Sequence, residues 1–468
     1  MDKLLTKVTV PNFKKSKAKF EKFNLSENPF PSEPVVNKES NDKRINGGIF
    51  ELAIRKKEYE QIVQNFIKQN QSDPNHLRLG FIMDTSYIGR GNGKSAFLIN
   101  LYEDINREYC LDISKGINKC FSIYFAPEPG GRTKSFNSFI ELFFNAVIKS
   151  EIINTCLAIL RLEAIQSISP KFDLGSHFKT TNELIYRLND SEWLNNNKLS
   201  INEINNKMIS NPILQDLPPE FPVFRGSNTL INSVVNQNDF IIYFRDELKK
   251  GKDRYDFIFS HIVKLFIAAG FNGAYILVDD FERIPDFQSA RQKRDFSLEL
   301  RTLLYDGSSL NAKIGFYNFI LVLHAGVPRL IADAWAASGM ENRVPISPKS
   351  ISKHIIPFEK LSKQHAKLLL QKYLSEYRIK VNKKDPLFPF TDNAITKIGE
   401  LSEYNAATIL KMAYDLIDKA AEIATQKTID GKFVVENRGI IETSNDSEII
   451  NINDAESIDL LKKAKSKE

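Results

Sequence analysis

The stretch that decides the fold is Leu77-Arg-Leu-Gly-Phe-Ile-Met-Asp84, followed by Thr85-Ser-Tyr-Ile-Gly-Arg-Gly-Asn-Gly-Lys-Ser95 and then by Ala96-Phe-Leu-Ile-Asn-Leu-Tyr-Glu-Asp-Ile105. Its residues predict a buried strand, a glycine-rich loop and a helix, in that order. Glycines at 89, 91 and 93 let the backbone curl so that several N–H groups point at one anion, with the N-terminus of the helix behind them. The stretch therefore predicts a phosphate-binding loop.

The loop matches most of the P-loop pattern GxxxxGK[ST]. In that pattern the lysine, here Lys94, reaches the β- and γ-phosphates, and the hydroxyl of the next residue, here Ser95, ligates magnesium. Ile88 stands where the pattern has its first glycine. The alternative is a glycine-rich turn that binds nothing, but the strand-loop-helix context favours a nucleotide site. The residues expected to hold ATP are Gly89, Gly91, Asn92, Gly93, Lys94, Ser95 and Ala96.

Length and composition indicate a soluble globular protein. The chain has 468 residues, of which 42% are hydrophobic and 26% charged, and this length allows two or three domains. It has no apolar run near the roughly 20 residues of a membrane span and no secretory pattern at its start, so we expect no membrane contact and a cytoplasmic location. Three cysteines without metal-ligand spacing predict free thiols. A net charge of +6 permits nucleic-acid contact without requiring it.

A second informative stretch is Gly273-Ala-Tyr-Ile-Leu-Val-Asp-Asp-Phe-Glu282, an apolar strand that ends in carboxylates. A P-loop protein needs such a strand beside its magnesium, and Asp279 is the expected partner of the metal through water. Asp280 and Glu282 are candidates for polarising the attacking water. The alternative is a plain strand followed by a helix cap.

Further apolar runs predict more strands, and they imply a parallel sheet because helical patterns separate them. One run covers 119–126, another covers 317–326, and a short final strand begins at Ile355. His324 lies at the C-terminal end of the second run, where a polar residue of an open α/β sheet faces the ligand region. A structural histidine is the alternative.

We predict an α/β fold: a P-loop NTPase-like parallel sheet flanked by helices, with an all-helical C-terminal lid domain. Residues 1–22 are expected to be a flexible basic arm, which either touches phosphate groups or is simply solvated. The ATPase domain is expected over 23–360, with an irregular insertion at about 170–250 that is rich in asparagine and proline. The helical lid is expected over 361–440, and a weakly ordered tail over 441–468.

The order of these features resembles the AAA+ ATPases, and within them the origin-recognition-type and transposition-regulator branch, with the STAND signalling ATPases as neighbours. The opening Phe23-x-Leu-x-x-Asn-Pro-Phe30 and the helix with Arg55 and Glu58 are similar to the first segment of that branch, which packs near the adenine. Pro357-Phe-Glu-Lys-Leu-Ser362 is similar to the start of its lid. The resemblance covers 23–170 and 253–425 and implies ATP and Mg²⁺ as ligands.

Three departures qualify what the resemblance implies. The acidic strand ends in Asp279-Asp280 where AAA+ enzymes usually carry Asp-Glu, a feature closer to STAND proteins that implies slow turnover. The lid segment Ser402-Glu-Tyr-Asn-Ala-Ala-Thr-Ile-Leu410 lacks the arginine that usually senses the γ-phosphate. Too few residues follow the lid for a winged-helix DNA-binding domain, which argues against a replication initiator.

Two functions of different classes remain open on these observations. The first is a slow ATPase that forms a homo-oligomer on ATP and regulates a protein partner acting on DNA, in transposition or antiviral defence, with DNA contacted through its backbone. The second is a nucleotide-switched scaffold whose ATP is structural. A P-loop kinase is disfavoured because kinases usually place a substrate lid soon after the loop.

An arginine from a neighbouring subunit is expected to act in such an assembly, because the lid segment 402–410 supplies none. The helix predicted over 289–304 carries Arg294 and Arg301. Arg301 is preferred because the resemblance puts the acting arginine near the end of this helix. The alternative is a solvated helix face.

Overall fold

The computed structural model describes residues 19–71, 73, 75–84, 91–172, 178–227, 233–323, 327–346, 352–381 and 384–437, with backbone only at 327–330. Most of the expected arm, the tail, Gly89 and His324 lie outside this part of the chain. The described residues fall into two compact units. A helical unit contains 19–56, 91–100 and 359–437, and a sheet unit contains most of 57–84 and 101–358. Each unit is described by itself.

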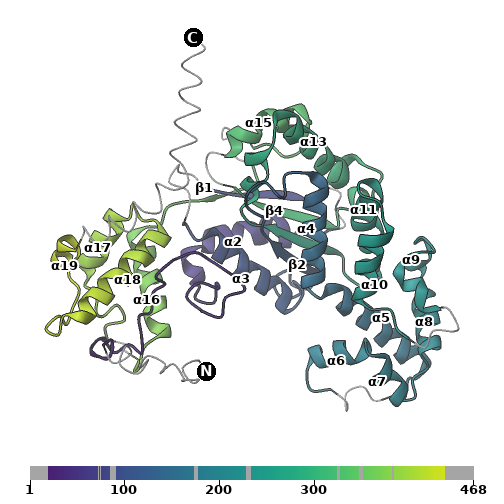
Figure 1. The fold of residues 1–468 in the computed structure, drawn as a ribbon, viewed down its shortest axis with the longest axis horizontal. Helices are drawn as coiled ribbons and strands as arrows, with labels where there is room; N and C mark the ends of the chain where they lie inside the picture. Colours follow the sequence, from purple (N-terminus) through teal and green to yellow (C-terminus); the bar gives the residue numbers. More distant parts are fainter. Residues whose placement is uncertain are drawn as a thin grey trace, which may run out of the picture. The chain divides into compact units, whose positions relative to one another are not determined.

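A five-stranded sheet forms the centre of the sheet unit (Figure 1). All of its strand pairs are parallel, and the spatial order is β2-β3-β4-β1-β5. The predicted α/β fold with a parallel sheet flanked by helices is confirmed. The strands are β1 Leu79–Asp84, β2 Cys120–Phe125, β3 Gly273–Val278, β4 Tyr317–Leu323 and β5 Ile355–Phe358.

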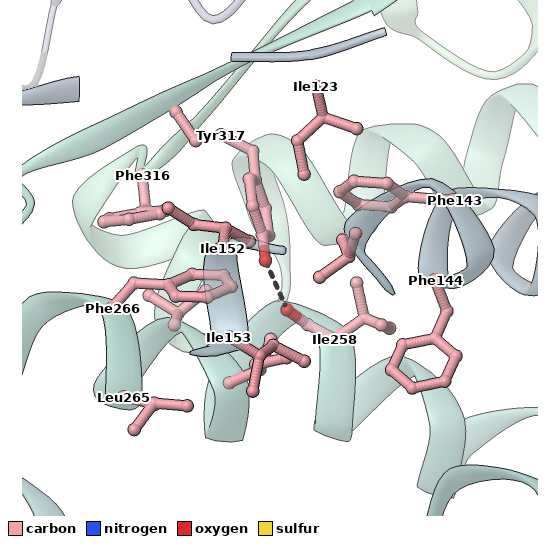
Figure 2. Close-up of a cluster of buried hydrophobic side chains, with 14 of the residues drawn as sticks. Ile123, Phe143, Phe144, Ile152, Ile153, Ile258, Leu265, Phe266, Phe316 and Tyr317 are labelled. Carbon is pink, nitrogen blue, oxygen red and sulfur yellow. Dashed lines mark hydrogen bonds between the residues drawn. The ribbon is translucent and has the colours of Figure 1, made fainter. Parts of the chain in front are cut away.

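Helices cover one face of the sheet with a large aromatic core. Because side chains alternate along a strand, Phe121 and Phe319 point into this core from β2 and β4. Tyr317 lies there too, and its hydroxyl donates to the backbone oxygen of Ile258 at 3.1 Å, as Figure 2 shows. The covering helices include α4 Phe136–Lys149, α5 Ile152–Ile168, α12 Ile262–Ala268 and α13 Ala290–Arg301.

A π-helical turn and the second half of an α-helix pack on the other face of the sheet. Helix α2, Lys56–Ile62, continues into a π-helical turn, Val63–Ile67, whose Phe66 lies against Gly80 of β1. A Cβ at position 80 would collide with the Phe66 ring, so only glycine fits there. The second half of helix α3, Lys94–Arg107, also lies on this face, since Asn106 bonds both backbone groups of Ser122.

The segment expected to be an irregular insertion is instead a series of short helices. Each begins at a residue whose side chain accepts a backbone N–H, so the abundant asparagine, serine and aspartate serve as helix caps. The caps are Thr180, Asp190, Ser200, Asn211 and Asn236. The helices are α6 Thr181–Leu188, α7 Ser191–Asn196, α8 Ile201–Ile209, α9 Pro212–Gln215 and α10 Gln237–Ile242.

Arg161 of α5 ties this helical insertion to the rest of the sheet unit. Its guanidinium, fully buried, donates to the side chain of Asn189 and to the backbone oxygen of Val235. Burial lowers the pKa of Arg161 to about 9. The remaining helices of the unit are α11 Lys252–Asp256, α14 Leu310–Ile314 and α15 Val327–Ala337, with π-helical turns at Phe257–His261 and Thr302–Asp306.

The helical unit contains the three helices expected near the C-terminus and one more (Figure 1). Its core also takes in Phe23 and Phe30 from the N-terminal segment. Residues 19–56 therefore belong with the helical unit, whereas the sequence grouped 23–360 together. The helices are α16 Lys363–Glu376, α17 Asp392–Leu401, α18 Ala406–Glu422 and α19 Gly431–Glu436.

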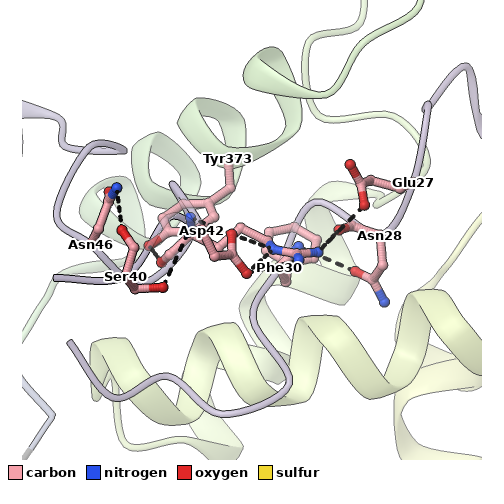
Figure 3. A network of polar contacts seen from close by, with 8 residues as sticks. Glu27, Asn28, Phe30, Ser40, Asp42, Asn46 and Tyr373 are labelled. Carbon is pink, nitrogen blue, oxygen red and sulfur yellow. Dashed lines mark hydrogen bonds and ion pairs between the residues drawn. The ribbon is translucent and has the colours of Figure 1, made fainter. Parts of the chain in front are cut away.

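A polar network fixes the N-terminal segment within the helical unit (Figure 3). Arg44 forms an ion pair with Asp42 at 2.8 Å and donates to the backbone oxygen of Asn28 at 2.9 Å. Tyr373 of α16 donates to the backbone oxygen of Arg44 at 3.0 Å. The Arg44 bonds hold the segment in its own fold, and the Tyr373 bond anchors it to α16.

Two expectations from composition can be compared with the described residues. In the described residues, no single helix is both long and apolar enough to cross a membrane. Helices α4 and α5 meet these criteria only when taken together, and they are bent by 52° relative to each other. Many side chains of this pair are buried in the core of the sheet unit. Cys110, Cys120 and Cys156 are buried free thiols, and burial raises the pKa of each.

Candidate functional site

The strand order of the sheet identifies a topological switch point. Strand β2 lies at one edge of the sheet and β5 lies at the other. The connection from β1 to β2 and the connection from β4 to β5 therefore run in opposite directions across the sheet. Strands β1 and β4 are neighbours, so their carboxyl ends form the switch point where open α/β sheets bind ligands. The glycine-rich loop is the segment that follows β1, and β3 lies next to β4.

The carboxylates expected beside the metal follow β3 directly. Asp279 is 3% exposed, and its backbone N–H donates to the oxygen of Phe125 at 2.9 Å, which extends the β2-β3 pairing by one residue. The hydroxyl of Tyr124 donates to Oδ2 of Asp279 at 3.0 Å. The N–H of Asp280 donates to Oδ1 at 2.9 Å. Both carboxylate oxygens of Asp279 are therefore held in place.

Asp280 and Glu282 have different surroundings. Asp280 has a left-handed backbone, with φ of 45°, and its carboxylate forms an ion pair with Arg283. Arg283 also donates to the backbone oxygen of Pro127 at 3.1 Å. Glu282 lies on a short 3-10 turn and is only 2% exposed. To orient a water molecule, the carboxylate of Asp280 must either break its ion pair with Arg283 or bind the water while it remains paired.

The described half of the glycine-rich loop lies in the helical unit. Gly91 and Gly93 have φ of 88° and 83°, values that glycine adopts without strain. Helix α3 begins at Lys94, and its first helical bond runs from the N–H of Phe97 to the oxygen of Gly93 at 3.0 Å. Lys94 is 5% exposed. The loop therefore presents a buried lysine at the N-terminus of a 14-residue helix.

The space around the two glycines tests whether a phosphate fits. Apart from its two chain neighbours, a Cβ added at Gly93 would meet no atom of the described residues within 4 Å, so these residues leave the space above Gly93 open. The first N–H groups of a helix have no partner within the helix, and they bind anions readily. Open space, helix N-terminus and lysine together suit a phosphate group. The side chains of Ser95 and Ala96 are half-buried in the same first turn of α3.

The loop also contacts the start of helix α18, within the helical unit. The N–H of Ala407 donates to the oxygen of Gly91 at 2.9 Å. A Cβ at Gly91 would approach Oδ1 of Asn405 to 2.6 Å and Cβ of Ala407 to 2.7 Å. Asn405 is the N-cap of α18 and accepts the N–H of Thr408. The loop and α18 therefore cannot move independently at Gly91.

Arg55 connects the loop with the segment that precedes α16. Its guanidinium donates to the oxygen of Asn92 and to the oxygen of Glu359, each at 2.9 Å. Arg55 is 4% exposed, and Asn92 is 2% exposed. A single buried side chain thus holds the glycine-rich loop and the start of the C-terminal helices together.

Alanine at Gly91 and at Gly93 should have distinguishable effects. Both substitutions carry the strain of a left-handed residue, about 1–2 kcal/mol. Only Gly91→Ala also collides with α18, so it should lower the free energy of unfolding by a further ~1–3 kcal/mol. Gly93→Ala should mainly weaken nucleotide binding, because its methyl group enters the open space. Chemical unfolding without nucleotide and ATP titration would separate the two effects, and equal losses of stability would contradict the contact with α18.

The arginines of α13 are engaged to different degrees. Arg301 forms an ion pair with Asp306 and donates to the backbone oxygen of Ser338 at 2.8 Å. Arg294 is about half exposed and pairs with the adjacent Asp295. Arg301 is therefore held within its own chain, and it must leave Asp306 to serve another subunit.

The sequence alone did not predict the contacts that three residues of the candidate site make. Arg55 was noted only as part of an opening segment, and nothing in the sequence links it to Asn92. The pairing of Tyr124 with Asp279 depends on β2 lying beside β3. Asn405 carries a usable signal, because an asparagine just before an apolar helical pattern predicts an N-cap.

No family model matches the chain, and no curated protein matches it.

Proposed function

We propose that this chain binds ATP with Mg²⁺ at the glycine-rich loop and hydrolyses it slowly, as an AAA+-type ATPase. The observation that supports the proposal best is the loop itself. Two left-handed glycines precede a buried lysine at the start of a long helix, and a Cβ at Gly93 would point into open space. The loop follows β1, one of the two strands at the switch point of the sheet.

The roles of the residues follow from their chemistry. Lys94 supplies a point charge to the β- and γ-phosphates, and backbone N–H groups of Gly93 to Ala96 surround them. Ser95 would hold Mg²⁺ through its hydroxyl, and Asp279 would hold it through water. The ion would neutralise charge on the phosphates. Asp280 or Glu282 would orient the attacking water.

The contacts of the loop support a link between nucleotide and assembly. Gly91 is bonded to Ala407 at the start of α18, and Asn92 is bonded to Arg55. A phosphate that reorients the loop would therefore act on both α18 and the start of the C-terminal helices. We propose that this change favours a homo-oligomer that recruits a protein partner acting on DNA. The second candidate is a scaffold that uses the same contacts with ATP as a structural ligand.

Phosphate release discriminates between the two candidates. A regulator of a DNA-acting partner should release phosphate from ATP slowly, and duplex DNA should change that rate. A scaffold should bind ATP without turnover and without a response to DNA. Size-exclusion chromatography with and without ATP and DNA shows whether assembly follows the nucleotide. Absence of ATP binding would exclude both candidates.

A shared site between subunits predicts complementation. The lid segment 402–410 supplies no arginine for the charge that builds on the γ-phosphate. An arginine in trans contributes about 10³–10⁵ in rate where it operates. Arg301→Ala protein keeps its nucleotide site, and Lys94→Ala protein keeps its arginine. A mixture of these two inactive proteins should regain ATPase activity, and the specific activity of the wild type should rise with its concentration.

The matched control for this mixture is Arg294→Ala, which removes the half-exposed arginine of the same helix. If the mixture of Arg294→Ala with Lys94→Ala protein regains ATPase activity and the mixture with Arg301→Ala does not, the arginine that acts in trans is Arg294. Inactive mixtures with both, or a specific activity independent of concentration, would rule out an arginine of α13 in trans.

A further inference from the structure

Tyr124 and Asp279 lie on neighbouring strands in a defined register. In the β2-β3 pair, Tyr124 is opposite Leu277, and Asp279 comes two residues later. Because side chains alternate along a strand, Tyr124, Leu277 and Asp279 belong to the same face of the sheet. The phenol of Tyr124 reaches Oδ2 of Asp279 at 3.0 Å.

We infer that Tyr124 is a positioning residue for magnesium, which it serves by fixing the carboxylate of Asp279. The inference rests on the proposed ATPase function, because it needs Asp279 to face the metal. The bonds from Tyr124 to Oδ2 and from the N–H of Asp280 to Oδ1 restrain rotation of the carboxylate plane.

The hydroxyl of Tyr124 stays protonated and remains a donor at neutral pH. Burial, together with the nearby Asp279 carboxylate, raises the pKa of Tyr124 far above its usual value of 10.0. Ionisation would place a second negative charge beside Asp279 and break the bond.

Partners that orient a metal-binding carboxylate typically change metal affinity about 10-fold to 100-fold. Tyr124→Phe removes one oxygen and keeps the ring, so the packing with Tyr102 of α3, at 6.5 Å between ring centroids, can remain. We expect this variant to raise the Mg²⁺ concentration for half-maximal ATP binding by about 10-fold or more. ATP affinity in EDTA should stay at the wild-type value.

Tyr102→Phe is the matched control. It removes a hydroxyl from the same ring pair, and that hydroxyl bonds Asn106. Its Mg²⁺ dependence should equal that of the wild type. Comparable thermal stability of the two variants separates a metal effect from a loss of packing.

The test titrates Mg²⁺ against a fluorescent ATP analogue for the wild type, the two tyrosine variants, Asp279→Asn, and the double variant of Tyr124 and Asp279. The inference predicts that Tyr124→Phe has no further effect once Asp279 is Asn, since the phenol acts through that carboxylate. Equal Mg²⁺ dependence of Tyr124→Phe and Tyr102→Phe, or additive effects in the double variant, would overturn it. A wild type whose ATP binding ignores Mg²⁺ would instead refute the proposed function.

Discussion

Lys94→Ala should abolish nucleotide binding while the chain stays folded. The lysine lies at the start of α3, where its charge would meet the β- and γ-phosphates, and alanine removes this charge-assisted contact. We expect ATP affinity to fall at least about 100-fold, which corresponds to about 2.7 kcal/mol. Calorimetric titration with Mg·ATP measures the loss directly.

Lys94→Met is the matched control for this prediction, because it keeps the buried aliphatic stem and removes only the charge. Both variants should lose binding to the same extent if the charge is responsible. Circular dichroism and thermal unfolding should match the wild type closely. Wild-type affinity in either variant would mean that the loop is not a phosphate site.

Asp280→Asn and Glu282→Gln should separate nucleotide binding from hydrolysis. Loss of the carboxylate that orients the water should lower turnover by about 100-fold or more and leave bound ATP trapped. We favour Asp280 because it adjoins Asp279 at the end of β3. Single-turnover hydrolysis of radiolabelled ATP, with a separate measurement of ATP affinity, shows which variant traps ATP.

Arg283→Met provides the matched control, since Asp280 is ion-paired with Arg283 in this structure. If Asp280 orients the water, this change should alter the turnover rate without abolishing it. If Glu282 does so, Arg283→Met should have a much smaller effect. Wild-type hydrolysis in both carboxylate variants would assign the chemistry to other residues.

The sequence predicted the sheet strands well, because each is a short, nearly continuous apolar run between polar segments. The sequence did not predict the order of the strands, because the position of β4 between β1 and β3 depends on long-range packing. The insertion was mistaken for irregular structure for a local reason. Its helices are too short to show a period, and residues such as Asn211 and Asn236 initiate helices rather than loops.

The N-terminal segment shows a similar limit. Phe23 and Phe30 could be recognised as residues available for burial, but their partners could not, and the structure packs them with the C-terminal helices. At the candidate site, the pattern of glycines identified the loop and its lysine. Arg55 and Tyr124 remained hidden because their bonds join strands, loops and turns that are distant in sequence.

Calorimetric titration of the full chain with ATP, in the presence and in the absence of Mg²⁺, tests the central claim most directly. The account predicts saturable binding of one ATP per chain that is strengthened by Mg²⁺ and lost in Lys94→Ala. Binding that is absent under both conditions, or that is unchanged in Lys94→Ala, would contradict it.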